Sequence, residues 1–322
     1  MTEETIIIEI PKKSLPYNFD YLLTHYVFYP WVVENKQLVR LFKLDSDKFV
    51  LIRVGFTEKP KDNLRVSVIS VLRLTQGERL WLVNLIKWMF ATDEEVEEFY
   101  EVICQKDLVL KAASEDIYGA HMRADPTVFE SIIGVIVAQN VFFQRIYEMT
   151  ELLCKRFGES QTIKGRIYYT FPTPQRLAEA PLSDIRTCKV GYRDKYIKGV
   201  AEKIVKEDLD LEKLKDSDDT EKIRETLISL PGVGPYTADL TIAISLKKPV
   251  FHLDLFSREA ICTFYFKNKK VEDKELRKFV ERKWGKWQRY VMLMLTTNTD
   301  TWAKKLNTKF RLKSAAKSLP VQ

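Results

Sequence analysis

The residues with the clearest chemical meaning lie in two short segments in the second half of the chain. The first, Leu230–Asp239, reads LPGVGPYTAD and places two glycines and a proline between two helical patterns. Glycine lets the backbone come close to a ligand, and a proline in the first turn of a helix leaves neighbouring amides pointing outward. Such a turn can hold a phosphate, including one of a DNA backbone. The alternative is a simple helix-to-helix connection that needs glycine for close packing.

A single aspartate follows this turn. Asp254 comes 20 residues after Gly234 and directly opens a new helical pattern beyond the helix stop Lys248-Pro249. Its carboxylate could do no more than cap that helix. Taken together, however, the two segments resemble the helix-hairpin-helix, Gly/Pro-rich, aspartate signature of the DNA glycosylase superfamily, to which endonuclease III, 8-oxoguanine DNA glycosylase and 3-methyladenine DNA glycosylase II belong.

The resemblance implies a role for the aspartate and a type of reaction. Cleavage of an N-glycosidic bond develops positive charge on the sugar, which a buried carboxylate can stabilise while it aligns or deprotonates the attacking water. Asp254 matches the catalytic aspartate of the family. Bifunctional members carry a lysine nucleophile two positions after the second hairpin glycine, where this chain has Tyr236. Lys247 and Lys248 lie at the far end of that helix, so the resemblance implies a monofunctional enzyme in which water is the nucleophile.

Further segments carry the resemblance over about residues 125 to 295. They include the turn Ala138–Val141, which looks like the family's glutamine-containing turn, and the segments 171–178 and 191–197, which are similar to the purine-specific branch. Asn140 in this turn resembles the 8-oxoguanine enzyme more than the apolar wedge of the alkylpurine enzyme. The DNA-binding residues implied by the resemblance are Gly232, Val233, Gly234, Gln139 and Asn140.

The base pocket is less well defined by the sequence. Its candidates are Tyr236, Phe142 and Trp287, although an aromatic pair in a buried helix and the face containing Trp284 and Trp287 are also typical of core packing. Thr296 stands where the 3-methyladenine enzyme has a tryptophan that stacks on the flipped base, so the identity of the base stays open. His252 lies close to Asp254 in sequence and could titrate near neutrality, which makes a catalytic role an alternative to a structural one.

The elements that position these residues fall into two parts. Up to about residue 78 the hydrophobic pattern has period two, which predicts a small antiparallel sheet domain over residues 1–78 with one short helix in Phe19–Tyr29. The expected strands are Thr5–Ile10, Leu38–Leu44, Lys48–Phe56 and Leu64–Leu74. This domain is similar to the extra N-terminal domain of the two purine glycosylases. The predicted fold class is therefore α+β.

From about Gly77 the period becomes helical, which predicts an all-helical glycosylase domain over residues 79–322. Asp125-Pro126 is expected to cap one long or twice-broken helix that ends at Gly158. A basic helix is expected from Asp194 to Lys206. The C-terminal tail from Thr301 is basic and suggests phosphate contacts, although a solvated face is the alternative. Its cationic residues are Lys304, Lys305, Lys309, Arg311, Lys313 and Lys317.

Composition excludes several classes of protein. The chain has 322 residues and a net charge of +7, which suggests a polyanionic partner. Its apolar runs are too short for a membrane helix and its acidic start does not fit a signal peptide, so we expect a soluble intracellular monomer of the cytoplasm or nucleoid without a membrane partner. The four cysteines are far apart, which predicts reduced thiols, no metal site and no iron–sulfur cluster. The resemblance leaves room for a monovalent cation at the hairpin.

The expected function is that of a base-excision-repair DNA glycosylase acting on double-stranded DNA with a damaged base. We expect it to flip out an alkylated or deaminated purine and to hydrolyse its N-glycosidic bond without a lysine nucleophile. One alternative is an 8-oxoguanine-type DNA glycosylase. Another is a catalytically silent helix-hairpin-helix protein that only binds DNA.

Overall fold

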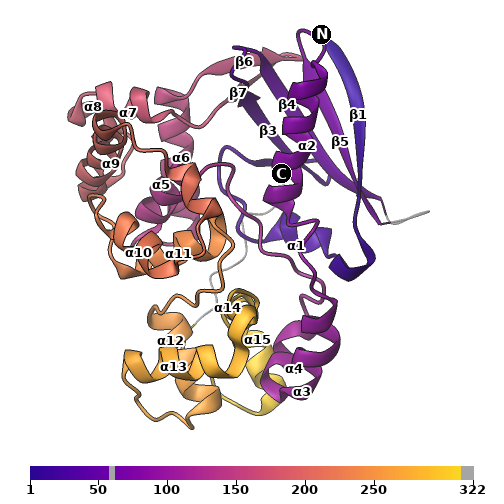
Figure 1. The fold of residues 1–322 in the computed structure, drawn as a ribbon, viewed down its shortest axis with the longest axis vertical. Helices are drawn as coiled ribbons and strands as arrows, with labels where there is room; N and C mark the ends of the chain where they lie inside the picture. The colour runs from indigo at the N-terminus through magenta and orange to yellow at the C-terminus, as the bar shows by residue number, and fades with distance from the viewer. Residues whose placement is uncertain (58–61, 313–322) are drawn as a thin grey trace.

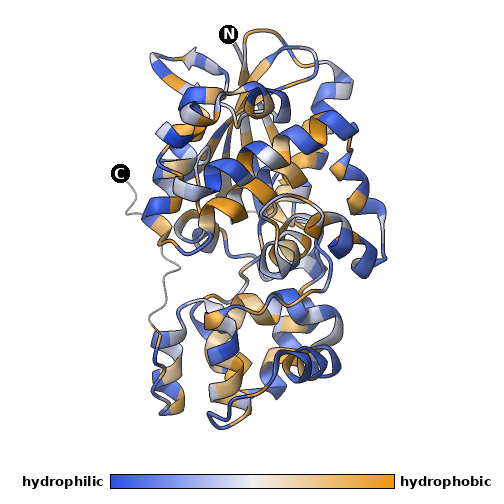
Figure 2. Ribbon diagram, turned by 90° about the vertical axis from the view of Figure 1, so that its left-hand side faces the viewer, coloured by the Kyte–Doolittle hydropathy of each residue, from blue (hydrophilic) through white to orange (hydrophobic). Residues whose placement is uncertain are grey.

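The computed structural model describes residues 1–57 and 62–312. It contains an antiparallel sheet at one end, a group of helices beside it and a second group of helices at the other end (Figure 1). Figure 2 shows hydrophilic and hydrophobic residues alternating within single helices, as amphipathic helices packed on a core require. The predicted α+β fold class is confirmed.

The sheet has five strands in the order β1-β5-β4-β3-β2, and all neighbours are antiparallel. The four predicted strands are present and a short fifth strand, β2, forms a hairpin with β3. The predicted helix of the region is shorter than expected and covers only α1, Phe19–Thr24. The strands are β1 Thr2–Glu9, β2 Val32–Glu34, β3 Gln37–Lys43, β4 Phe49–Thr57 and β5 Asn63–Ser70.

Both faces of the sheet are covered. One face packs against α2, Gln76–Phe90, which begins with a capping box of Thr75 and Glu78. The other face carries a small apolar cluster to which Ile163 and Tyr168 contribute. These two residues belong to a hairpin of β6 Ser160–Ile163 and β7 Arg166–Tyr169, so the expectation of an all-helical second domain is wrong at this point. Strands of four residues carry too little periodicity to be seen in the sequence, and docking on the sheet stabilises them.

The helices form two groups (Figure 1). The first surrounds one apolar core and includes the two helices that flank the glycine hairpin. The second packs with α3 and α4, which come from the N-terminal half of the chain. The first group is α5 Val128–Ala138, α6 Phe143–Phe157, α7 Pro174–Glu179, α8 Leu182–Thr187, α9 Asp194–Glu207, α10 Thr220–Ile228 and α11 Pro235–Ser245. The second is α3 Cys104–Lys106, α4 Leu108–Glu115, α12 Leu255–Tyr265, α13 Asp273–Trp284, α14 Gln288–Thr296 and α15 Thr299–Trp302.

Two helix boundaries differ from the predictions. The helix expected to begin at Asp125-Pro126 begins at Val128, because Thr127 accepts the capping hydrogen bond from the Glu130 amide at 3.1 Å. It is interrupted once, between α5 and α6, rather than running unbroken or breaking twice. Trp284 and Trp287, predicted to share one helix face, do not lie on one continuous helix, because Gly285, with a φ of +47°, ends α13 before α14 starts.

A buried ion pair joins the sheet to the first helical group. Arg40 of β3 donates two hydrogen bonds of 2.6 Å to the carboxylate of Glu130 on α5, and both side chains are almost fully buried. The two parallel bonds match the planar guanidinium to the carboxylate and hold the sheet against the helix.

In the described ranges no helix is long and apolar enough to cross a membrane. Lys313 and Lys317 of the basic tail lie outside the described residues.

Candidate active site

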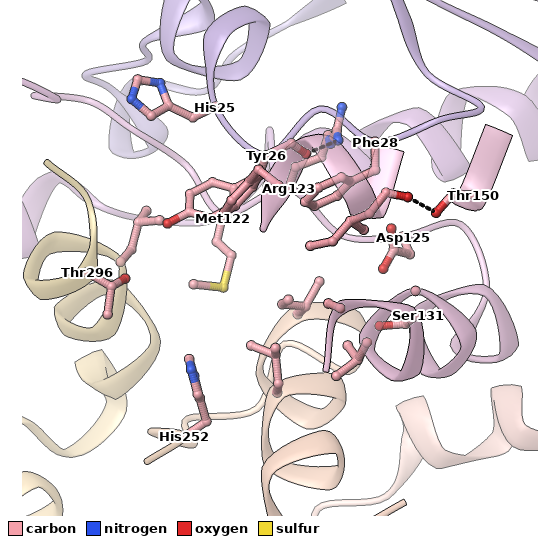
Figure 3. Close-up of a pocket in the computed structure, with 18 of the residues that line it drawn as sticks. His25, Tyr26, Phe28, Met122, Arg123, Asp125, Ser131, Thr150, His252 and Thr296 are labelled. Carbon is pink, nitrogen blue, oxygen red and sulfur yellow. Dashed lines mark hydrogen bonds between the residues drawn. The ribbon is translucent and has the colours of Figure 1, made fainter. Parts of the chain in front are cut away.

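A cavity of about 350 Å³ lies where the N-terminal region, the first helical group and the second helical group meet. Most of its wall is apolar or aromatic, and its polar groups are few. Figure 3 shows His252 and Thr296 on one side of it and Asp125 and Ser131 on the other. An apolar pocket with a few convergent polar groups is the usual form of a small-ligand site.

Asp254 lies in the wall of this cavity as the N-cap of α12. Its Oδ1 accepts a hydrogen bond of 2.7 Å from the Ser257 amide, and its own amide donates to Ser257 Oγ at 2.9 Å. Burial opposes ionisation of the carboxyl, but His252 and the bonds from Ser257 outweigh it, so the pKa of Asp254 falls to about 2. The cap therefore keeps a negative charge in an apolar cavity.

Two aromatic rings stand beside this carboxylate. His252 places Nε2 3.6 Å from Asp254 Oδ2, which is ion-pair distance but too long for a hydrogen bond. Tyr236, from the first turn of α11, meets the imidazole edge to face with ring centroids 5.5 Å apart. Burial raises the pKa of Tyr236 to about 12, so its phenol stays neutral. Of the three predicted base-pocket residues, Tyr236 is the one that lines the cavity.

The other two base-pocket candidates lie elsewhere. The Phe142 side chain is 83% exposed at the start of α6, outside the cavity. Trp287 is buried, but it packs against Phe99 and Tyr290 with ring centroids 5.4 and 6.2 Å away and does not line the cavity. In the sequence, the type and spacing of both residues fit a core position as well as a pocket position. Only the packing of the folded chain shows which aromatic residues line the cavity.

The glycine hairpin connects α10 to α11, as predicted. Gly232 has a φ of +74°, and a Cβ there would lie 2.3 Å from Cγ of Tyr196, so this position excludes any larger residue. Gly234 differs, since its backbone is extended and nothing lies within 4 Å of where a Cβ would be. The first glycine shapes the turn, and the second leaves open space in front of the start of α11.

The remaining predicted DNA-binding residues surround this hairpin. Gln139 donates from Nε2 to the Gly232 carbonyl and to Thr237 Oγ1, both at 3.1 Å, so its side chain ties the end of α5 to the hairpin. Asn140 is exposed and has a φ of +53°, a conformation that asparagine tolerates better than most residues. The Val233 side chain is buried in the core of the first helical group. Contacts of Gln139 and Val233 with DNA remain predictions. Because the Gln139 side chain is hydrogen-bonded and the Val233 side chain is buried, such contacts would use backbone atoms.

Several cavity residues were not identified from the sequence. Tyr26, Met122 and Arg123 come from the N-terminal region, and Asp125 precedes α5. Arg123 donates to the Tyr26 carbonyl at 2.8 Å, which fixes two wall segments to each other. Asp125 is partly buried, and burial together with the charge of Glu130 raises its pKa to about 6. These residues have no shared motif, because segments about 100 residues apart meet only in the folded chain.

Lysines are absent from the cavity wall in the part of the chain that the structure describes. Lys247, at the far end of α11, makes a 3.0 Å ion pair with Glu94 and lies 4.5 Å from the ring centroid of Trp88. Lys248 pairs with Asp218 at 3.0 Å. Both amines therefore have partners away from Asp254.

The described residues contain no group of three or more histidine, cysteine or acidic side chains placed to hold a metal ion. The four cysteines are buried free thiols, which agrees with their predicted reduced state. The monovalent cation considered for the hairpin stays a prediction.

Comparisons with known proteins address the family directly. Residues 133–286, which include the hairpin and Asp254, match the model of the HhH-GPD superfamily of base excision DNA repair proteins. The chain therefore contains a domain of this superfamily. The HhH-GPD match begins in α5 and ends just after α13, so it spans the first helical group and part of the second.

The individual relatives are named either as 3-methyladenine glycosylases or as N-glycosylase/DNA lyases. The chain is 27% identical to a DNA-3-methyladenine glycosylase of Bacillus subtilis, over 91% of this chain and 96% of the other. It is 28% identical to a probable N-glycosylase/DNA lyase of Methanothermobacter thermautotrophicus, over 65% of this chain and 72% of the other. Among solved structures it is similar to the 3-methyladenine DNA glycosylase of Archaeoglobus fulgidus, with a TM-score of 0.74, 22% identity and coverage of 91% and 97%. It is also similar to a Clostridium acetobutylicum 8-oxoguanine glycosylase/lyase bound to double-stranded DNA, with a TM-score of 0.66, 20% identity and coverage of 87% of this chain and 99% of the other.

Proposed function

We propose that this base-excision DNA glycosylase is monofunctional: it hydrolyses the N-glycosidic bond of a damaged purine in double-stranded DNA and leaves the strand uncut. The observation that carries the proposal is an ionised aspartate beside an apolar cavity whose described wall contains no lysine. Water is then the nucleophile, because no amine in that wall is placed to attack the sugar.

The chemistry follows from the surroundings of Asp254. Breaking the glycosidic bond leaves positive charge on the sugar, and a carboxylate in a low-dielectric cavity stabilises that charge more strongly than it would in water. The capping bonds from Ser257 hold the carboxylate in one orientation, so little reorganisation is needed at the moment of reaction. The oxygen that is not held by the cap hydrogen bond, Oδ2, is available to orient the attacking water.

The hairpin supplies the proposed contact with the DNA backbone. Gly234 precedes Pro235 at the start of α11 and leaves open space before the amides of the first turn. The amino end of a helix attracts a phosphate through those amides and the helix dipole. A contact of this kind positions a duplex without reading its sequence.

The substrate is an alkylated or deaminated purine in this proposal. A cavity of about 350 Å³ is at the lower end of the range for small-ligand pockets, and the rings of Tyr26, Phe28 and Tyr236 in its wall offer flat surfaces for a base. Similarity to a probable N-glycosylase/DNA lyase favours a bifunctional glycosylase as the second candidate, and the resemblance of Asn140 to the 8-oxoguanine enzyme makes 8-oxoguanine its expected substrate.

One experiment separates these candidates. Duplexes with a single alkylated purine, hypoxanthine, uracil or 8-oxoguanine are incubated with the enzyme and analysed with and without alkali, which cuts abasic sites. We expect base release without strand cutting until alkali is added. Borohydride added during turnover should trap no covalent protein–DNA adduct, and a Tyr236→Lys variant gives a control in which an amine is placed near the sugar. Efficient trapping of the wild type would show that a lysine is the nucleophile and overturn the proposal.

A further inference from the structure

His252 is the one titratable side chain that shares the cavity wall with Asp254 at ion-pair distance in the described residues, and hydrolysis as proposed above assigns it only the stabilisation of the Asp254 charge. The side chain is buried, and Figure 3 shows its ring directed into the cavity from the side opposite Asp125. Its Nε2 faces Asp254 Oδ2 at 3.6 Å and its Nδ1 contacts the Met292 sulfur. Both ring nitrogens therefore face atoms that accept hydrogen bonds.

This arrangement constrains the protonation of the ring. A neutral imidazole has one donor and one acceptor nitrogen, so one of them would direct a lone pair at a thioether or a carboxylate. An imidazolium has an N–H for each of these two atoms and is attracted by the carboxylate of Asp254 at 3.6 Å. The geometry thus suits a ring that carries a transferable proton next to the place where the base leaves.

We propose that His252 is the general acid that protonates a leaving base that carries no positive charge. This inference rests on the proposed function, because it concerns the same glycosidic bond. As the bond between the sugar and the base nitrogen breaks, its electron pair goes to the base, and the His252 proton is transferred to a base nitrogen. Water then bonds to the sugar carbon and loses a proton to Asp254, which returns that proton to His252 across the 3.6 Å contact. One water is consumed, and both side chains regain their starting charges.

The proposal separates two classes of damaged purine. Hypoxanthine is neutral in DNA, so it needs a proton to leave as a neutral base. A ring-methylated purine such as 7-methylguanine carries a fixed positive charge, so it leaves as a neutral base without a proton. His252 should therefore matter for the first class and have little influence on the second.

Several charged and titratable groups lie near His252. Asp254 of α12 and Tyr236 of α11 face the ring, and Tyr26 from the N-terminal region faces Asp254 and Tyr236. α14 contributes the uncharged Met292 and Thr296, and Asp125 lies in the opposite wall. Asp254 has a pKa of about 2 and Tyr236 one of about 12, so at neutral pH the carboxylate beside the ring is ionised and the phenol is neutral.

The test measures single-turnover excision of hypoxanthine and of 7-methylguanine from otherwise identical duplexes at one neutral pH. His252→Gln keeps a hydrogen-bond donor but cannot act as an acid. It should lower hypoxanthine excision on the order of 100-fold and leave 7-methylguanine excision within about threefold.

Several outcomes overturn the inference and are distinguishable from failure of the proposed function. Equal loss of both activities in His252→Gln would assign the residue a structural role, and unchanged excision of both lesions would exclude it as the acid. Release of cationic bases alone by the wild type would also overturn the inference while leaving hydrolysis intact. His25, which lines the same cavity from the end of α1, provides the control, and His25→Gln should leave the ratio of the two rates unchanged. The proposed function itself fails only if Asp254→Asn retains excision or if a lysine adduct is trapped.

Discussion

Two aspartates in the wall of one cavity have opposite electrostatic surroundings. Burial disfavours ionisation of both. At Asp254 the contacts of His252 and Ser257 outweigh burial and bring the pKa to about 2. At Asp125 burial dominates, the negative charge of Glu130 adds to it, and the pKa rises to about 6 despite Arg123 nearby. Burial alone therefore does not decide which carboxyl carries a charge; the donors that face it do.

This difference assigns separate roles to the two sides of the cavity. The side of Asp254 holds a fixed anion next to a histidine, which is suited to stabilising positive charge in a transition state. The side of Asp125 adjoins the buried Arg40–Glu130 ion pair that links the sheet to α5. The first side is suited to chemistry, whereas the second holds the N-terminal region against the helical core.

The largest expected effect is on excision. Asp254→Asn keeps the capping oxygen but removes the charge, so excision of a known lesion should fall about 1,000-fold, which corresponds to roughly 4 kcal/mol of transition-state stabilisation. Asp125→Asn is the matched control and should lower excision by less than about tenfold. Single-turnover rates of both folded variants measure the contrast. Similar losses in the two variants would remove the distinction between the sides, and a folded Asp254→Asn with wild-type rates would refute its catalytic assignment.

The second effect is on stability as a function of pH, and the two aspartates should act with opposite sign. Asp125 has a raised folded-state pKa, so its contribution is fully present below about pH 4 and is lost as pH rises through about 6, by roughly 3 kcal/mol. Asp254 has a lowered pKa, so its contribution is present above about pH 4 and is lost as pH falls toward 2. Denaturant unfolding of wild type, Asp125→Asn and Asp254→Asn across pH 3–8 measures both. A wild-type-like pH slope in Asp125→Asn would show that Asp125 is not the group responsible.

A smaller effect is expected when one contact of Asp254 is removed. Ser257→Ala deletes the acceptor of the Asp254 amide and the donor to the His252 carbonyl, both within 3.0 Å, and should cost about 1 kcal/mol of unfolding free energy. The Ser257 hydroxyl also helps to lower the pKa of Asp254, so its loss should raise that pKa and move the acid limb of the excision profile to higher pH, although the bond from the Ser257 amide to Oδ1 remains. Excision at neutral pH should remain within about threefold, because the carboxyl stays ionised there. An unchanged acid limb would mean that the Ser257 hydroxyl does not contribute to the charge of Asp254.

The smallest effect concerns DNA binding. It tests whether the difference between the two aspartates affects only the chemical step, while a separate part of the molecule binds the duplex. Gly234→Asp places a carboxylate in the open space before α11 and should weaken binding about tenfold, equally for damaged and undamaged duplexes. Gly234→Ala is the uncharged control and should bind nearly as wild type. Affinities measured across a salt series check this prediction, and equal affinities of the Asp variant and the wild type would contradict a phosphate contact. The excision rate at saturating DNA should be the same in both variants as in the wild type.

Much of the fold followed from the sequence. Period-two patterns predicted four of the five strands, because β1, β3, β4 and β5 are long enough to show which face is buried. Helix signals predicted α9, α10, α11 and the cap of α12. The β6–β7 hairpin was missed because its strands are short, and the start of α5 was misplaced because Thr127 competes with Asp125 as a cap only two residues away.

The candidate site divides in the same way. The glycine hairpin and Asp254 were predictable because both depend on local backbone geometry: a positive φ at Gly232 and an N-cap at the start of α12. Trp287 could not be placed, because its sequence surroundings are the same for a core aromatic and for a pocket aromatic. Phe142 is in neither environment, because it stands in the break between α5 and α6, where its side chain is exposed.

The amino-acid sequence by itself determined the hairpin, the aspartate that follows it and the absence of a lysine at Tyr236, since each is a residue type at a fixed position in the chain. The tertiary structure decided which groups face that aspartate. His252 and Tyr236 meet Asp254 because α11 ends in a loop that returns to the start of α12, and Tyr26 and Met122 close the cavity from a distant part of the chain. The charge of a buried carboxyl depends on every dipole and charge within a few ångströms, and such neighbours are set by packing rather than by sequence distance.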